Sequence, residues 1–144
     1  MLMTGSGRID AQRAFTRLAR ARRRASIVSR LRRCTACSRL RVYDRAAARA
    51  SAAGGIREIP LDAISGTLEP SRATQFDSDF RPAPLARTRW ERVWLAEQRG
   101  QVLPPISVVP VADGYAIRDG HHRVSVARAR GALTIDAQVD VLPG

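Results

Sequence analysis

The residues best suited to chemistry lie in one short run, Asp119-Gly120-His121-His122-Arg123. Glycine lets the backbone turn sharply and approach a ligand closely, and arginine presents a planar fork of donors to phosphate oxygens. Histidine titrates near neutrality and can donate or accept a hydrogen bond or bind a metal ion. The run therefore indicates a site for an anion, above all for a phosphate group.

The segments on either side of this run supply a second reason. A short apolar strand, Tyr115–Ile117, precedes it, and a helical pattern, Val124–Arg130, follows it and ends at Gly131. Free N–H groups and the helix dipole favour an anion where a helix begins. The alternative is that Asp119 caps the helix and that both histidines are polar turn residues. Spacing alone favours neither interpretation.

The rest of the second half of the chain mixes helix and strand patterns. Strands are expected at 56–59, 106–109 and 135–141, a hairpin turn at Asp113-Gly114, and a helix at 85–99 whose Trp90 and Trp94 serve the core. Residues 61–64 read as a turn, 66–72 as an extended stretch, and 75–84 as a polar, mobile loop. The class is therefore α+β, a small mixed sheet with flanking helices.

Charge divides the chain into two parts. Residues 1–55 contain 14 arginines against two acids, a net charge of +12, whereas residues 56–144 contain 11 arginines and 11 acids. We therefore expect a basic helical arm with a linker (1–55) and a neutral domain (56–144). A chain starting at Gly55 is expected to fold and to lose most of its affinity for polyanions.

Within the arm, residues 9–33 have the pattern of an amphipathic helix, and residues 39–50 that of a second short helix anchored by Tyr43. Residues 51–55 read as a linker. The densest charge predicts contacts with nucleic acid or another polyanion at Arg22, Arg23, Arg24, Arg32 and Arg33.

Cys34 and Cys37 form a CxxC pair without the further cysteines of a zinc site or a disulfide framework. We expect the pair to be dispensable for folding and ligand binding. The first residues lack the apolar region of a signal peptide, and no uncharged apolar run reaches the roughly 20 residues of a membrane span, so a cytoplasmic protein is expected.

Three segments in this order resemble the ParB/sulfiredoxin superfamily from about Ile56 to Val141. They are Ile59–Ile64 at the entry to the domain, Leu103–Ile106 before a strand, and the DGHHR run with the small-residue helix that follows it. The resemblance implies a ParB/sulfiredoxin-like fold. Sulfiredoxins carry a catalytic cysteine where this chain has His121, so it does not imply that activity.

The resemblance also implies a ligand. Segregation-type ParB proteins bind the triphosphate of CTP with a Gly-Glu-Arg-Arg box, whose ends match Gly120 and Arg123. The DGHHR form is closer to small ParB-like proteins that include nucleotide-dependent free-serine kinases, which use an upstream glutamate as base. Glu69 lies in the comparable stretch, so a kinase would use Glu69, Asp119 and His122 for catalysis.

These observations leave three functional hypotheses. The first is a ParB-like domain that binds a nucleotide (ATP, ADP or CTP, with Mg²⁺) at Gly120, His121, His122 and Arg123, with a basic arm that contacts nucleic acid. The second is a phosphotransferase that acts on a small hydroxyl substrate. The third is a non-catalytic interaction module whose arginine helix binds an acidic protein, RNA or an anionic membrane surface.

Overall fold

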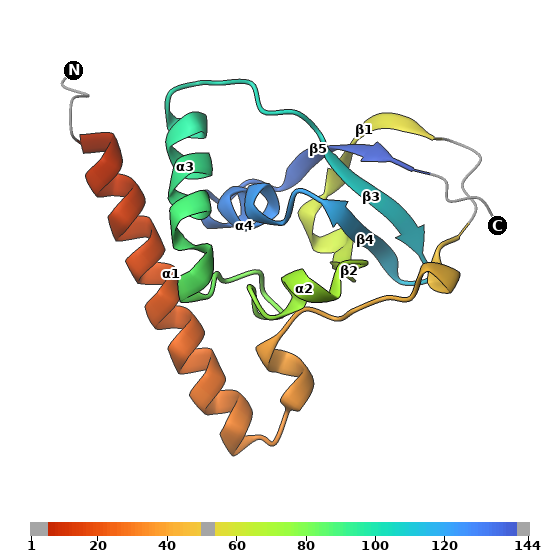
Figure 1. The fold of residues 1–144 in the computed structure, drawn as a ribbon, viewed down its shortest axis with the longest axis horizontal. Coiled ribbons are helices and arrows are strands. Elements are labelled where there is room, and N and C mark those ends of the chain that lie inside the picture. The colour runs from red at the N-terminus through yellow and green to blue at the C-terminus, as the bar shows by residue number, and fades with distance from the viewer. Residues whose placement is uncertain (1–5, 50–53, 141–144) are drawn as a thin grey trace.

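A computed structural model describes residues 6–49 and 54–140 of the chain, and its centre is a five-stranded sheet (Figure 1). The strands lie in the order β1-β5-β3-β4-β2. Their bounds are Gly55–Pro60 (β1), Ile64–Thr67 (β2), Ile106–Val111 (β3), Gly114–Asp119 (β4) and Thr134–Val139 (β5). Pairs β1–β5 and β3–β4 are antiparallel, and pairs β3–β5 and β2–β4 are parallel. The sheet is therefore mixed.

Helices cover one side of the sheet in successive layers. Helix α4 (His121–Ala129) packs against β3, α3 (Arg87–Gln98) packs against α4, and α1 (Ser6–Leu31) packs against α3. Figure 1 shows this order, with α1 outermost and its C-terminal end extending past α3. A short helix, α2 (Pro70–Ala73), follows β2, and 3-10 turns lie at Thr35–Ser38, Arg45–Ala47, Leu61–Ala63 and Pro84–Ala86.

The predicted class, α+β with a small mixed sheet and flanking helices, is confirmed. The expected strands correspond to β1, β3 and β5, and the expected hairpin joins β3 to β4, where Val111 pairs with Gly114. The expected helix at 85–99 is α3, and Trp90 is fully buried in the core. Strand β2 joins the end of the expected turn at 61–64 to the start of the expected extended or loop stretch at 66–72. It was not predicted as a strand, because its four residues include Gly66 and carry no alternating pattern.

Helix α1 packs into the hydrophobic core. Ala11, Ala14 and Phe15 are buried, and the Phe15 ring meets the edge of the Trp90 ring at 5.7 Å between centroids. One core thus includes side chains from both sides of residue 55. The division at residue 55 stays a prediction about folding.

The second helix expected in the arm, at 39–50, is not formed in the described residues up to 49. Backbone bonds join Tyr43 N to Thr67 O at 2.8 Å and Thr67 N to Arg41 O at 2.9 Å, so this segment runs along β2. Leu40 and Tyr43 are buried. A close approach explains Gly66, because a Cβ there would overlap the backbone carbonyl of Arg41. Residues 50–53 of the expected linker lie outside the described residues.

The end of α1 is fixed by its backbone and by a disulfide. Arg33 has φ of 55°, and Cys34 N donates to Ser29 O at 2.8 Å, which closes the helix as a left-handed residue usually does. Cys34 and Cys37 are joined by a disulfide across the next turn. The cysteines are thus a bonded pair, and their expected dispensability stays a prediction.

No helix in the described residues is both long and apolar enough to cross a membrane.

Candidate anion-binding site

The backbone turns at Gly120, between β4 and α4. Its φ of 113° and ψ of 22° lie in the left-handed region, which is costly for residues with a Cβ. A Cβ at this position would also overlap the Ile106 side chain on β3. Glycine is therefore required here by both conformation and space, as the sequence interpretation assumed.

Helix α4 begins directly after this turn without a side-chain cap. Its N-cap residue is Gly120, and no side chain accepts a hydrogen bond from the helix start. Asp119 forms an ion pair with Arg123 at 3.2 Å instead, and its side chain is 82 % exposed. The alternative in which Asp119 caps the helix is therefore wrong. The first N–H groups of α4 stay available to an anion.

His121 is the first residue of α4 and is buried. Its Nε2 lies 2.6 Å from Thr67 Oγ1 at the end of β2, and Thr67 Oγ1 also accepts from Glu69 N at 2.9 Å. The Phe76 ring stacks on the imidazole at 6.3 Å between centroids. Burial and then the charge of Arg72 lower the pKa of His121 to about 4.

His122 is likewise buried and contacts the edge of Phe76 at 5.2 Å between centroids. Burial, followed by the charges of Arg89 and Arg72, lowers its pKa to about 4. Both histidines are therefore neutral imidazoles at pH 7. They are buried in the first turn of α4, whereas the alternative interpretation placed them in a polar turn. A neutral imidazole can donate one hydrogen bond and accept another.

Arg123 makes several contacts within the protein. Its Nη1 donates to Pro104 O at 2.5 Å and Pro105 O at 2.9 Å, and its Nη2 donates to Asp119 at 3.2 Å. The guanidinium thus holds the loop before β3 against the turn at Gly120. Arg123 contributes positive charge to the site, and it also positions the loop that forms one wall.

A cavity of about 300 Å³ opens at the start of α4. Residues from α2, α3, the loop before β3 and the DGHHR run line it: Arg72, Arg89, Val93, Leu103, Pro104, Asp119, Gly120, His121, His122 and Arg123. Arginine charge thus surrounds two neutral imidazoles and a helix start, with one carboxylate among the lining residues. The structure brings four of the predicted ligand-binding residues together at this cavity, which suits an anion.

Sequence reasoning missed Arg72 and Arg89. Arg89 is exposed and forms no ion pair within the described residues, and Arg72 Nη1 donates to Gln75 at 3.2 Å. Neither lies in a motif, because α2 is a single turn and Arg89 is one of several arginines on α3. Only the packing of α2 and α3 around α4 identifies them.

A second cavity, of about 320 Å³, adjoins the first at Leu103, Pro104 and Arg123. It is also lined by Glu97, Gly100, Gln101, Val102, Ile135 and Asp136. Together the two volumes are in the range of small-molecule sites. The first cavity is the cationic one, and the second carries carboxylates.

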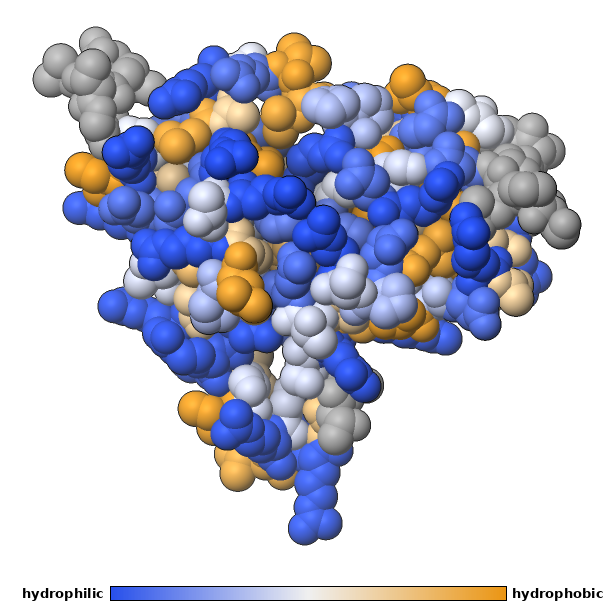
Figure 2. All heavy atoms as spheres, viewed as in Figure 1, coloured by the Kyte–Doolittle hydropathy of each residue, from blue (hydrophilic) through white to orange (hydrophobic). Residues whose placement is uncertain are grey.

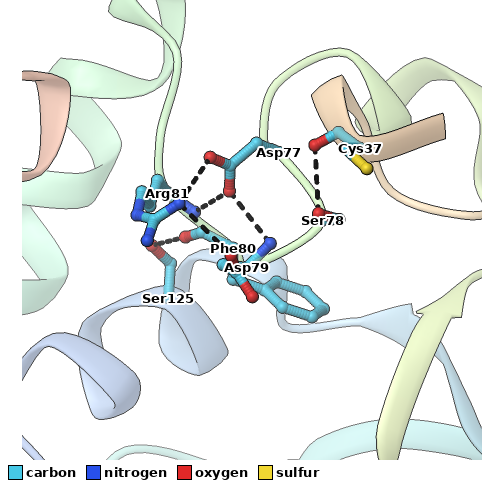
Figure 3. A network of polar contacts seen from close by, with 7 residues as sticks. All are labelled: Cys37, Asp77, Ser78, Asp79, Phe80, Arg81 and Ser125. Carbon is cyan, nitrogen blue, oxygen red and sulfur yellow. Dashed lines mark hydrogen bonds and ion pairs between the residues drawn. The ribbon is translucent and has the colours of Figure 1, made fainter. Parts of the chain in front are cut away.

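The loop at 75–84, which was expected to be mobile, is held by polar contacts centred on Asp77 (Figure 3). Asp77 is buried, and its carboxylate accepts hydrogen bonds from Asp79 N and Arg81 N. Arg81 Nη1 also donates to this carboxylate, at 3.3 Å. Ser125 Oγ on α4 donates to Phe80 O at 2.6 Å. The loop is therefore tied to α4, and the Phe76 ring is held against both histidines.

Glu69, the expected catalytic base, does not line the cavity. Its side chain is exposed, and its backbone N–H bonds to Thr67. The five arginines expected to contact nucleic acid lie on α1 and just after it, and all except half-buried Arg22 are exposed. No described residue of this set forms an ion pair.

Comparisons with known proteins give one structural likeness. No protein-family model matches the chain, and no curated protein matches it in sequence. A sulfiredoxin from Arabidopsis thaliana is similar in structure, with 22 % sequence identity and a TM-score of 0.39. The likeness covers 60 % of this chain and 85 % of the sulfiredoxin.

Proposed function

We propose that the protein binds a nucleotide through its phosphate groups at the start of α4. The cavity that combines Gly120, the two neutral histidines and the arginines carries this proposal. A bound phosphate would accept from the first N–H groups of α4 and neutralise the charge of Arg72 and Arg89, because the one carboxylate of the cavity, Asp119, is paired with Arg123. The adjoining cavity would hold the rest of the ligand.

We assign the chain to ParB-like nucleotide-binding domains on the DGHHR run and the segments that accompany it. ATP, ADP and CTP, each with Mg²⁺, are the candidate ligands. The uncompensated charge of α1 supports a second part of the proposal, contact with nucleic acid or another polyanion. α1 contains eight arginines and a single acid, Asp10, which accepts from Gln98.

Binding of nucleotides is tested by a thermal-shift panel of ATP, ADP, CTP, the nucleosides adenosine and cytidine, and sulfate, with and without Mg²⁺, on the full chain. A ligand that binds only the native state raises the free energy of unfolding by about 2.7 kcal/mol at a hundredfold excess over its Kd. The melting temperature rises with it. We expect at least one nucleotide to give a larger shift than its nucleoside at the same concentration. Equal shifts for nucleotide and nucleoside, or no shift from any anion, would contradict the proposal.

The kinase hypothesis is separated from simple binding by Glu69→Gln. The glutamate lies outside the cavity wall, so the substitution should leave nucleotide affinity unchanged. Phosphorylated serine formed by the native protein and abolished in this variant would support a kinase. Absence of product from the native protein, with binding intact, would reject it.

A further inference from the structure

We propose that a groove along α1 binds one sugar-phosphate strand of a nucleic acid. Its residues come from α1 and from the start of α3: Ile9, Gln12, Arg13, Thr16, Arg17, Arg20, Arg24 and Arg87. The volume of this α1 groove is about 700 Å³. The inference rests on the proposed polyanion contact of α1 and assigns it to residues that differ from the expected set, of which only Arg24 is shared.

The four arginines from α1 follow one another at helical spacing. Arg13, Arg17, Arg20 and Arg24 are four, three and four residues apart, so they share a face of the helix, and all four are exposed. At about 1.5 Å per residue the row is roughly 16 Å long. One strand of a duplex advances about 3.4 Å per phosphate, so the row spans about five phosphates.

The charge of this row is not balanced by the protein. No arginine of α1 forms an ion pair with a described residue. Like charges at helical spacing repel one another and destabilise the helix, which is held instead by its packing on α3. Hydrophilic surface predominates along α1 in Figure 2. A phosphate backbone would relieve this repulsion and release its counterions.

Arg87 contributes a fifth guanidinium from the opposite wall. Its Nε donates to Glu91 at 2.9 Å, and its guanidinium lies over the Phe15 ring at 5.1 Å. One N–H of the five in an arginine is used in this bond, so the outer nitrogens can still donate to phosphate. The side chain is thus held in place at the groove before any ligand arrives.

The composition of the groove favours a nucleic acid over a protein or a membrane. Ile9 is the one large apolar side chain among the lining residues, and no aromatic side chain lines the groove, whereas protein interfaces depend on apolar and aromatic anchors. Beside the groove, the apolar face of α1 is buried in the core through Ala11, Ala14 and Phe15 and cannot enter lipid as an interfacial helix does. The exposed apolar side chains Ile27, Val28 and Leu31 lie beyond the groove, at the C-terminal end of α1. Without aromatic side chains for base stacking, the contact should be independent of sequence.

Two triple variants with the same loss of charge test the groove. R13Q/R17Q/R20Q removes three groove arginines, and R23Q/R32Q/R33Q removes three exposed arginines outside it. Glutamine keeps much of the length of arginine and has similar helix propensity. Binding to a fluorescent 20-nucleotide DNA strand, its duplex and the matching RNA is measured by anisotropy over a range of salt concentrations, together with phosphatidylserine vesicles.

We expect the groove variant to bind at least tenfold more weakly and the control variant less than threefold. The slope of log K against log salt should be about 2 shallower for the groove variant with single strands, since each phosphate contact contributes about 0.7. Equal losses in the two variants, or a larger loss in the control, would overturn the inference. Binding of the native protein to vesicles but to no nucleic acid would overturn it in favour of a membrane.

The nucleotide panel is independent of this test. Intact nucleotide binding with equal losses in the two variants would overturn the groove and leave the site at α4 standing. If the native protein binds no nucleotide, and only the groove variant loses nucleic-acid binding, the site at α4 is overturned and the groove stands. Circular dichroism of both variants checks that α1 is still folded.

Discussion

Thr67 Oγ1 and His121 Nε2 lie 2.6 Å apart, although 54 residues separate them in the sequence. This contact joins the end of β2 to the first residue of α4. It fixes the orientation of the imidazole, and Thr67 also binds Glu69 N and approaches Ile117 O at 3.3 Å. One threonine hydroxyl thus connects two strands and the site.

Thr67→Val tests the structural weight of that hydroxyl. Valine has a similar shape, so the main effect is to leave buried partners of Thr67 without a hydrogen bond. We expect a loss of about 1–3 kcal/mol in the free energy of unfolding, measured by urea denaturation. Thr74→Val, at an exposed position, is the control. Equal stability of the two variants would show that the contact between Thr67 and His121 does not stabilise the fold.

Gly120→Ala should damage folding more than the same change at Gly131. Both residues have positive φ, 113° and 78°, so both substitutions carry a backbone cost of about 1 kcal/mol. Only at Gly120 does the new Cβ overlap a neighbour, Ile106, whereas Gly131 has open space. Urea denaturation of the two variants measures the difference. Similar losses would mean that β3 yields to the extra methyl group.

The stability of the fold should fall as the pH drops from about 6.5 toward 4. The pKa of His121 and that of His122 are about 4 in the fold, below the usual 6.5, so the unfolded chain binds more protons across this window. Each histidine contributes a slope of at most about 1.4 kcal/mol per pH unit. The contribution is fully present above pH 6.5 and is lost as the pH falls.

This pH dependence can be assigned to the histidines. A hydrogen bond with Tyr43 lowers the pKa of Asp113 below 3.8, so the effect of that carboxylate lies at lower pH. Urea denaturation at pH 7, 6 and 5 measures the slope, and NMR titration of the imidazole protons gives the two pKa values directly. Imidazole pKa values near 6.5 in the folded protein would contradict the burial argument.

Sulfate should bind more tightly at pH 5 than at pH 7, because the pKa of both imidazoles is about 4 in the fold and an anion raises it. An anion in the cavity stabilises the protonated imidazoles that Arg72, Arg89 and burial disfavour, so binding is coupled to proton uptake. Asp119 favours protonation of both histidines. Calorimetry in two buffers with different ionisation enthalpies measures the protons taken up. Affinity that does not change with pH would show that sulfate binds away from the histidines.

The sequence allowed the elements with strong periodicity or turn chemistry to be predicted. The alternation at 135–141 and the Asp113-Gly114 hairpin identified β5 and the β3–β4 pair, and Trp90 identified the buried face of α3. Charge counts alone suggested a separable arm, because they do not reveal that Ala11, Ala14 and Phe15 form a continuous buried stripe. Packing decided the place of α1.

The site was predicted in its local part and missed in its long-range part. Gly120, His121, His122 and Arg123 are consecutive, so a motif can identify them. Arg72 and Arg89 line the cavity because α2 and α3 pack beside α4, and Thr67 on β2 contacts His121. No pattern in the sequence indicates that packing. Arg123 was predicted only as a phosphate ligand, but it also holds the loop before β3 through Pro104 and Pro105. These contacts are 19 and 18 residues away in the sequence, so the motif does not indicate them.

The most direct test of the anion site compares Arg89→Gln with Arg92→Gln on the full chain. Both side chains are exposed on α3, three residues apart, but only Arg89 lines the cavity at the start of α4. Isothermal titration measures the affinity of the strongest-binding nucleotide and of sulfate for each variant. We predict that Arg89→Gln weakens both ligands about tenfold, the effect of losing one charge-assisted contact of about 1.4 kcal/mol, and that Arg92→Gln leaves both unchanged. Equal affinities in the two variants would contradict a phosphate site at the start of α4.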